Sequence, residues 1–145
     1  MVSLKINGRK IKAAEGMTIL QAARVNDIEI PTLCSNDALK PYGACRLCVV
    51  EIGKNGRVTV DTSCTYPVSD GLEVQTNTPR IREARKMILE LHLARCPNVQ
   101  IVQELAAEYG VTESAQQMGK DNEYCILCGL CVRACNDVVK AGAVI

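Results

Sequence analysis

The residues best able to do chemistry in this chain are its nine cysteines, eight of which fall into two widely separated groups, with Cys96 alone between them. The first group has the spacing C-x10-C-x2-C-x15-C and comprises Cys34, Cys45, Cys48 and Cys64. Thiolates bind soft metals, and four of them complete the coordination of two tetrahedral irons bridged by sulfide. The small residues Gly43 and Ala44 let the backbone come close to such a cluster. We therefore expect a [2Fe-2S] cluster at these four cysteines.

A structural zinc site is the main alternative for the first group, because four cysteines also satisfy zinc. Zinc knuckles usually contain two short C-x2-C pairs, whereas this group has one pair and two distant single cysteines. Its long first gap also departs from the C-x4-C-x2-C spacing of plant-type ferredoxins. The spacing favours iron–sulfur, and a zinc-stabilised interaction module stays as an alternative.

The second group has the spacing C-x2-C-x2-C-x3-C and comprises Cys125, Cys128, Cys131 and Cys135. This run is typical of [4Fe-4S] ferredoxins, although Asn136 stands where proline is usual. The first three thiols fit three corners of the cluster. Two cysteines compete for the fourth corner, and we favour Cys96, which precedes Pro97, over Cys135.

The patterns before residue 78 predict a small mixed sheet with one helix packed across it. Residues 2–6 alternate apolar and polar side chains, and the turn Asn7-Gly8 returns the chain as a second strand over 9–13. Thr18, with Gln21 three residues later, predicts the capped start of a helix. Further strands are expected over residues 47–52, 58–60 and 72–75.

The character of the chain changes at Thr78-Pro79, which favours the start of a long helix. Its expected apolar face contains Ile81, Ala84, Met87, Ile88 and Leu91. Its charged residues, Arg80, Arg82, Arg85 and Lys86, are predicted to form a solvated face. A second helix is expected over 98–109, so we predict two domains, residues 1–77 and residues 78–145.

Composition excludes several classes of function. The net charge of +1 over 145 residues does not fit a strongly basic nucleic-acid binder. The sequence has no apolar run long enough to span a membrane and no recognisable export signal, so we expect a cytoplasmic protein. It also lacks a Walker loop and a Rossmann fingerprint, so the chain itself is expected to be non-catalytic and to have no nucleotide site.

Residues 1–135 resemble the N-terminal iron–sulfur region shared by the large iron–sulfur subunit of complex I, the iron-only hydrogenases and NAD(P)-linked oxidoreductase subunits. The resemblance rests on both cysteine groups, on Thr78-Pro79 to Ala94, on Leu105–Val111 and on the segment GACRLCVVEI at residues 43–52. It implies an α+β fold, with an N-terminal β-grasp [2Fe-2S] ferredoxin domain followed by a small helical domain that carries a ferredoxin-like [4Fe-4S] loop.

The chain departs from this family after the long helix. Family members usually carry a His-x3-Cys-x2-Cys-x5-Cys cluster there. His92 and Cys96 remain, but Val99 and Leu105 stand where the next two cysteines would fall. We therefore expect no histidine-ligated cluster, and an ordinary packing or solvent-contact role for His92.

The resemblance implies an electron-transfer subunit of an NAD(P)-linked oxidoreductase. Its partner would be an NAD(P)H-oxidising flavoprotein subunit of the complex I type, with a ferredoxin or a second flavoprotein as a further partner in flavin-based electron bifurcation. The alternative is a freestanding two-cluster ferredoxin that diffuses between enzymes. Two oxidised clusters, each contributing −2, would bring the net charge from +1 to about −3. Mobile ferredoxins are often far more acidic, which favours the subunit.

Overall fold

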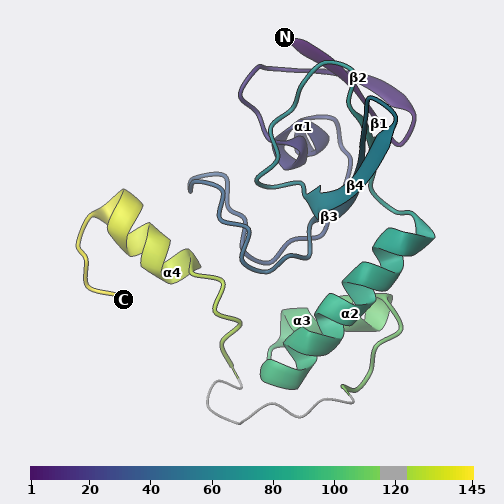
Figure 1. The fold of residues 1–145 in the computed structure, drawn as a ribbon. Helices are drawn as coiled ribbons and strands as arrows, with labels where there is room; N and C mark the ends of the chain where they lie inside the picture. The colour runs from purple at the N-terminus through teal and green to yellow at the C-terminus, as the bar shows by residue number, and fades with distance from the viewer. Residues whose placement is uncertain (115–123) are drawn as a thin grey trace.

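The computed structural model describes residues 1–114 and 124–145 (Figure 1). Five strands form one mixed sheet in the order β2-β1-β5-β3-β4. The strands are β1 (Val2–Ile6), β2 (Arg9–Ala13), β3 (Val49–Lys54), β4 (Arg57–Thr62) and β5 (Glu73–Gln75). The predicted mixed sheet is confirmed, and it is consistent with a [2Fe-2S]-binding domain.

The sheet is built from two antiparallel hairpins joined by the short central strand β5. In the first hairpin Val2 pairs with Ala13, and in the second Val49 pairs with Thr62. β5 runs parallel to β1 and antiparallel to β3, so Val74 lies between Ile6 and Ile52. Both tight turns use a residue pair with positive φ, Asn7-Gly8 and Asn55-Gly56.

Helix α1 (Ile19–Val25) is capped as the sequence predicts. The Thr18 hydroxyl accepts a hydrogen bond from the Gln21 amide, and the Gln21 side chain accepts one from the Thr18 amide. Amides of the first turn, which have no partner within the helix, also donate to carbonyls of the segment after β4, including that of Ser63. These bonds hold α1 against the segment that carries Cys64.

The core beneath α1 is aliphatic, because the sequence has no Phe and no Trp. Its fully buried side chains come from both hairpins, from β5 and from one face of α1. The largest of them are Ile6, Ile19, Leu20, Val50, Ile52, Leu72 and Val74.

Two further helices, α2 (Pro79–Arg95) and α3 (Gln100–Glu108), pack on each other beside the sheet (Figure 1). The Thr78 hydroxyl accepts a hydrogen bond from the Ile81 amide, so the predicted start of α2 is confirmed. The predicted face of α2 is partly wrong, because Met87 is 60% exposed and Leu91 is also exposed. The side chains buried at four-residue intervals are Ile81, Arg85, Leu89 and Leu93.

A second apolar cluster fills the space between these helices and the loop that precedes β3. It includes Leu47 from the loop, Leu89 and Leu93 from α2, and Val102 and Ala106 from α3. The molecule therefore has two cores, one under α1 and one against α2 and α3.

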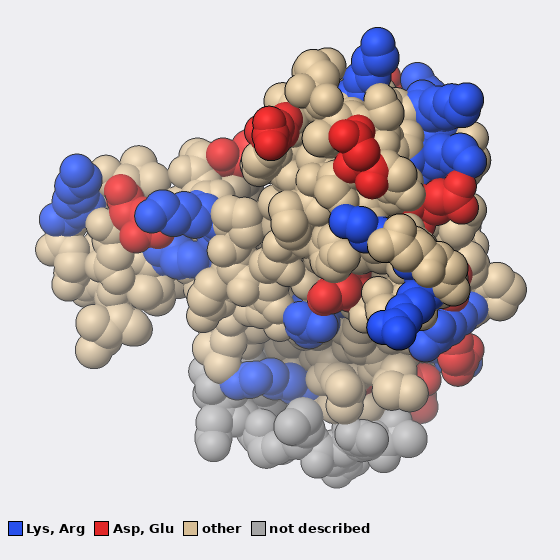
Figure 2. All heavy atoms as spheres, turned by 45° about the horizontal axis from the view of Figure 1, so that its top comes forward, with Lys and Arg blue, Asp and Glu red and all other residues tan. Residues whose placement is uncertain are grey.

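The C-terminal segment ends in α4 (Leu130–Arg133), which continues directly into the π-helical turn η2 (Ala134–Val139). None of the residues in these two elements is buried. Figure 2 shows this segment as a projection from the rest of the molecule, and it shows charges of both signs interspersed over the visible face. Within residues 1–114 and 124–145, no helix is both long enough and apolar enough to cross a membrane.

Candidate metal centre

The four cysteines of the first group come together at one end of the sheet and are all buried. Cys34, Cys45 and Cys48 lie on the long connection between α1 and β3, and Cys64 follows β4.

The close approach of Gly43 to Thr65 helps to shape this site. Gly43 has φ +74°, and a Cβ there would lie 3.2 Å from the Thr65 methyl carbon. A larger residue would be strained at that position.

Cys34 and Cys45 form the first pair. The Cys45 amide lies 3.5 Å from the Cys34 sulfur, and the Leu33 amide donates to the Cys45 sulfur at 3.4 Å. The hydrogen bond from the Cys34 thiol lowers the pKa of Cys45 to about 5, with further help from backbone amides. The same hydrogen bond raises the pKa of Cys34, and burial raises it further. The two shifts are opposite in direction, so the pair favours a thiolate at Cys45 that accepts from a thiol at Cys34.

Cys48 and Cys64 form the second pair. The hydrogen bond from the Cys64 thiol lowers the pKa of Cys48 to about 6, and it raises the pKa of Cys64. Ser63 fixes the backbone here, because its amide and its hydroxyl both donate to the Cys48 carbonyl oxygen, at 3.0 Å and 2.8 Å. The two pairs are neighbours, because Cys45 of the first pair and Cys48 of the second are three residues apart on the same connection.

This donor set fits a cluster with two metal ions better than a site with one. A [2Fe-2S] cluster with four cysteines has two thiolates on each iron. A tetrahedral zinc ion instead needs all four sulfurs around a single point. The two neighbouring thiol pairs fit [2Fe-2S].

The two thiol pairs belong to different cores. Cys48 and Cys64 pack within the cluster under α1, whereas Cys34 and Cys45 pack within the cluster that contains α2 and α3. A cluster bound at all four sulfurs would therefore join the two cores. The spacing of the cysteines contains no signal of this division.

Arg85 holds α2 against the connection that carries the cysteines. Its guanidinium donates from Nε to the Leu47 carbonyl at 3.1 Å and from Nη2 to the Val49 carbonyl at 2.8 Å. Nη1 also lies 3.2 Å from the Tyr109 hydroxyl. The expectation of a solvated charged face is wrong for Arg85, which is 2% exposed. The sequence did contain a signal for the burial of Arg85, because Arg85 stands four residues after the buried Ile81 and four before the buried Leu89.

His92 contacts the same connection. Its Nε2 lies 3.1 Å from the carbonyl oxygen of Cys45, and the carbonyl oxygen of His92 accepts from the Cys96 sulfur at 2.9 Å. His92 thus makes a specific packing contact with the backbone of the first cysteine group.

The structure brings part of the second cysteine group towards Cys96. Burial raises the pKa of Cys96. Cys128 packs against the apolar cluster that contains Cys96. Cys131 is exposed on α4, and the Cys135 sulfur accepts a hydrogen bond from the Ala143 amide at 3.3 Å. Residues 115–123, within the connection to this group, lie outside the described residues.

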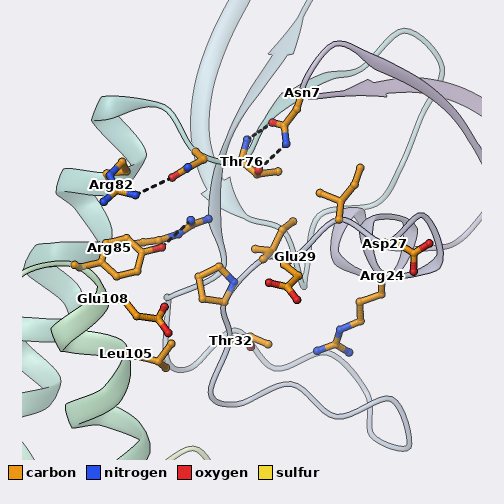
Figure 3. Close-up of a pocket in the computed structure, with 15 residues that line it drawn as sticks. Asn7, Arg24, Asp27, Glu29, Thr32, Thr76, Arg82, Arg85, Leu105 and Glu108 are labelled. Atoms are coloured by element: carbon orange, nitrogen blue, oxygen red, sulfur yellow. Dashed lines mark hydrogen bonds between the residues drawn. The ribbon is translucent and has the colours of Figure 1, made fainter.

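An open groove of about 1050 Å³ runs between the segment after α1 and helices α2 and α3 (Figure 3). Side chains of both charges line it. The basic ones include Arg24 and Arg82, and the acidic ones are Asp27, Glu29 and Glu108. The sequence contains no signal for this groove, because its walls come from segments far apart in the chain.

Residues 1–79 match the family described as "2Fe-2S iron-sulfur cluster binding domain", and that range contains all four cysteines of the first group. The chain belongs to this family. The resemblance seen in the sequence is confirmed, and the two neighbouring thiol pairs are the feature of this [2Fe-2S] domain that suits its cofactor.

Longer relatives extend the similarity over both cysteine groups. The NADP-reducing hydrogenase subunit HndD of Solidesulfovibrio fructosivorans is 35% identical over 98% of this chain and 29% of its own length. The NADPH-Fe(3+) oxidoreductase subunit alpha of Geobacter sulfurreducens is 35% identical over 99% of this chain and 20% of its own. The mitochondrial NADH-ubiquinone oxidoreductase 78 kDa subunit of Candida albicans is 31% identical over 97% and 23%. This chain thus spans less than a third of each of these relatives.

A solved structure shares the fold. The crystal structure of an NAD+-reducing [NiFe]-hydrogenase in the H2-reduced state superposes with a TM-score of 0.79 and 30% identity. The match covers 94% of this chain and 66% of that chain. It therefore extends beyond the sheet into the helical part.

Proposed function

We propose that this chain is an electron-transfer subunit, or the electron-transfer part of one, in an NAD(P)-linked oxidoreductase. It would relay single electrons between a flavoprotein subunit and another redox centre. The observation that carries the proposal is the buried site of two neighbouring thiol pairs, in which Cys45 and Cys48 already favour the thiolate form. Cys34, Cys45, Cys48 and Cys64 would hold a [2Fe-2S] cluster, which supplies the one-electron chemistry when bound.

The protein's own contribution is to position the site and keep water from it. The four sulfurs are buried between two apolar cores, and amides of Leu33 and Cys45 point at sulfur atoms. Amide donors and burial set the potential of an iron–sulfur site, because they stabilise the extra negative charge of the reduced form.

A second centre is part of the proposal. Cys125, Cys128 and Cys131 would provide three ligands of a [4Fe-4S] cluster, with Cys96 as the fourth and Cys135 as the alternative. The packing of Cys128 against the apolar cluster that contains Cys96 supports the first choice.

The names of the relatives support a partner subunit within an NAD(P)-linked complex. HndD is named as a subunit of a hydrogenase that reduces NADP, and the Geobacter sulfurreducens protein as a subunit of an NADPH oxidoreductase. We propose that this chain receives electrons from, or delivers them to, an NAD(P)H-oxidising flavoprotein subunit. A ferredoxin or a second flavoprotein would be the further partner if the complex bifurcates electrons. A freestanding ferredoxin is the less favoured alternative.

Anaerobic reduction tests this function. The chain, purified with its iron–sulfur centres, is mixed with NADH or NADPH, with and without the flavoprotein expressed from the same host, and its visible absorption is followed. The proposal predicts bleaching only when the flavoprotein is present, and co-purification of the two in a fixed ratio. Bleaching by the nucleotide alone would overturn the relay role. Reduction without any stable complex would favour the mobile carrier.

A further inference from the structure

Arg133, within the second cysteine group, contacts the first cysteine group 99 residues earlier in the sequence. Its guanidinium donates from Nη2 to the carbonyl oxygen of Cys34 at 2.6 Å and from Nη1 to the carbonyl oxygen of Lys40 at 2.9 Å. Cys34 belongs to the first thiol pair, and Arg133 lies between Cys131 and Cys135. A single side chain therefore connects the two cysteine groups.

Tyr42 completes the contact on the same connection. The guanidinium carbon of Arg133 lies 4.6 Å from the centre of the Tyr42 ring, within the range of a cation–π interaction. Gly129 also lies against this ring. It has φ +69°, and a Cβ there would come within 3.2 Å of the Tyr42 ring. The close approach of Gly129 lets the segment sit against the aromatic ring.

Apolar packing of the helix contributes little to this docking, because α4 and η2 have no buried residues. In Figure 2 the C-terminal segment stands out from the rest of the molecule. The hydrogen bonds of Arg133 tie the helix to the body of the molecule at the connection that carries the first cysteine group. The guanidinium is well enclosed, since its Nε is a buried donor without a hydrogen-bond partner in the described part of the chain.

We propose that Arg133 is a positioning residue for electron transfer between the two cysteine sites. It fixes the second site on the ligand-bearing connection of the first, and it holds a permanent positive charge at the Cys34 peptide. This inference rests on the proposed function. The transfer moves one electron from the reduced site to the oxidised site and breaks no bond. A fixed positive charge favours the more negative, reduced form of the first site, so it raises the midpoint potential there.

Two substitutions separate the charge from the docking. Arg133→Met removes both, whereas Arg133→Lys keeps the charge and loses the planar fork that reaches two carbonyls at once. Arg46→Met is the matched control, because Arg46 is an exposed arginine beside Cys45 whose ion-pair partner is Asp61, at 3.8 Å. All variants should fold, because none removes a side chain from either core.

The test measures two properties of the anaerobically purified full chain. These are the hydrogen-exchange protection of amides 130–139 and the midpoint potential of the [2Fe-2S] signal in an electron paramagnetic resonance titration. We expect Arg133→Met to lower the hydrogen-exchange protection of these amides about tenfold, because two charge-assisted hydrogen bonds are lost. We also expect it to lower the midpoint potential of the [2Fe-2S] signal, because the positive charge is lost. Arg133→Lys should lose less protection than Arg133→Met, because the ammonium can keep one hydrogen bond to the connection, and should therefore keep the potential within error. Arg46→Met should keep the protection.

The outcomes distinguish this inference from the proposed function. Wild-type protection or a wild-type potential in Arg133→Met would overturn the role of Arg133 and leave the relay function standing. Failure of the wild-type chain to take up any [2Fe-2S] cluster would overturn the proposed function. The exchange data would then still report whether Arg133 docks the C-terminal segment.

Discussion

Arg85 on α2 donates a hydrogen bond of 2.8 Å from Nη2 to the carbonyl oxygen of Val49, the first residue of β3. The pairing of β3 with β5 begins only at Glu51, so the carbonyls of Leu47 and Val49 precede that ladder. Arg85 binds both of these carbonyls. The helical half of the molecule thus satisfies backbone groups next to the metal centre.

Arg85→Met is expected to destabilise the chain by roughly 3 kcal/mol, because two buried carbonyls lose their donor. Arg80→Met on the same helix is the control, since Arg80 is exposed. Urea unfolding of the two variants measures the difference in the free energy of unfolding. Equal stabilities would mean that the contacts of Arg85 contribute nothing net.

The fold could be predicted largely from local signals. The Asn7-Gly8 turn, the Thr18 capping box and the Thr78-Pro79 start of α2 each depend on neighbours in the sequence, and each is present. The burial of Arg85 and the contact of Arg133 with Cys34 depend on carbonyls 38 and 99 residues away. Periodicity cannot identify such partners, so a charged residue on a helix was assigned to solvent.

For the candidate site, too, the sequence predicts local features but not long-range packing. Cysteine type and spacing predict the four residues of the first group as ligands, because thiolates are the soft ligands that iron–sulfur sites use. The spacing contained no signal that the pair Cys34 and Cys45 would pack with α2 while Cys48 and Cys64 pack under α1. That arrangement depends on how the two halves of the chain fold against each other.

We propose that residues 1–77 form a β-grasp domain that folds alone around its [2Fe-2S] cluster. Without α2 and α3, Cys34, Cys45 and Leu47 lose the apolar cover that Leu89 and Leu93 provide. The fragment should therefore reconstitute but lose its cluster to a chelator faster than the full chain, as followed by visible absorption. An unfolded fragment after reconstitution would place the domain boundary after α2 instead.

The stability of the metal-free chain should depend on pH through Cys45 and Cys48. An ordinary thiol keeps its proton up to about pH 9.0, whereas folded Cys45 and Cys48 lose theirs at about 5 and 6. The unfolded chain therefore binds more protons in this window, and the free energy of unfolding rises with pH from about 6 to about 9. As the pH falls through the two folded pKa values, this contribution is lost.

Above about pH 9 the sign reverses, because the pKa values of Cys34 and Cys64 are raised. Urea unfolding at about pH 6.5 and about pH 8.5 checks the prediction within the first window. A double variant, Cys45→Ser and Cys48→Ser, serves as the control, since serine does not titrate there. The same pH dependence in both proteins would contradict the assignment.

The fourth ligand of the second site can be tested by substitution. A cluster corner without a thiolate loses iron easily, so replacing the true ligand should leave a three-iron cluster that electron paramagnetic resonance detects. We expect this signal from Cys96→Ala, and an unchanged four-iron signal from Cys135→Ala. A three-iron signal from Cys135→Ala alone would reverse the assignment. No effect from either variant would mean that neither cysteine is the fourth ligand.

The central claim is that the two cysteine groups hold one [2Fe-2S] and one [4Fe-4S] cluster. Anaerobic iron and acid-labile sulfide analysis of the full chain, combined with electron paramagnetic resonance of the reduced protein, tests it most directly. The account predicts about six irons and about six sulfides per chain, with two distinct signals. About one zinc per cysteine group, with no labile sulfide, would contradict it.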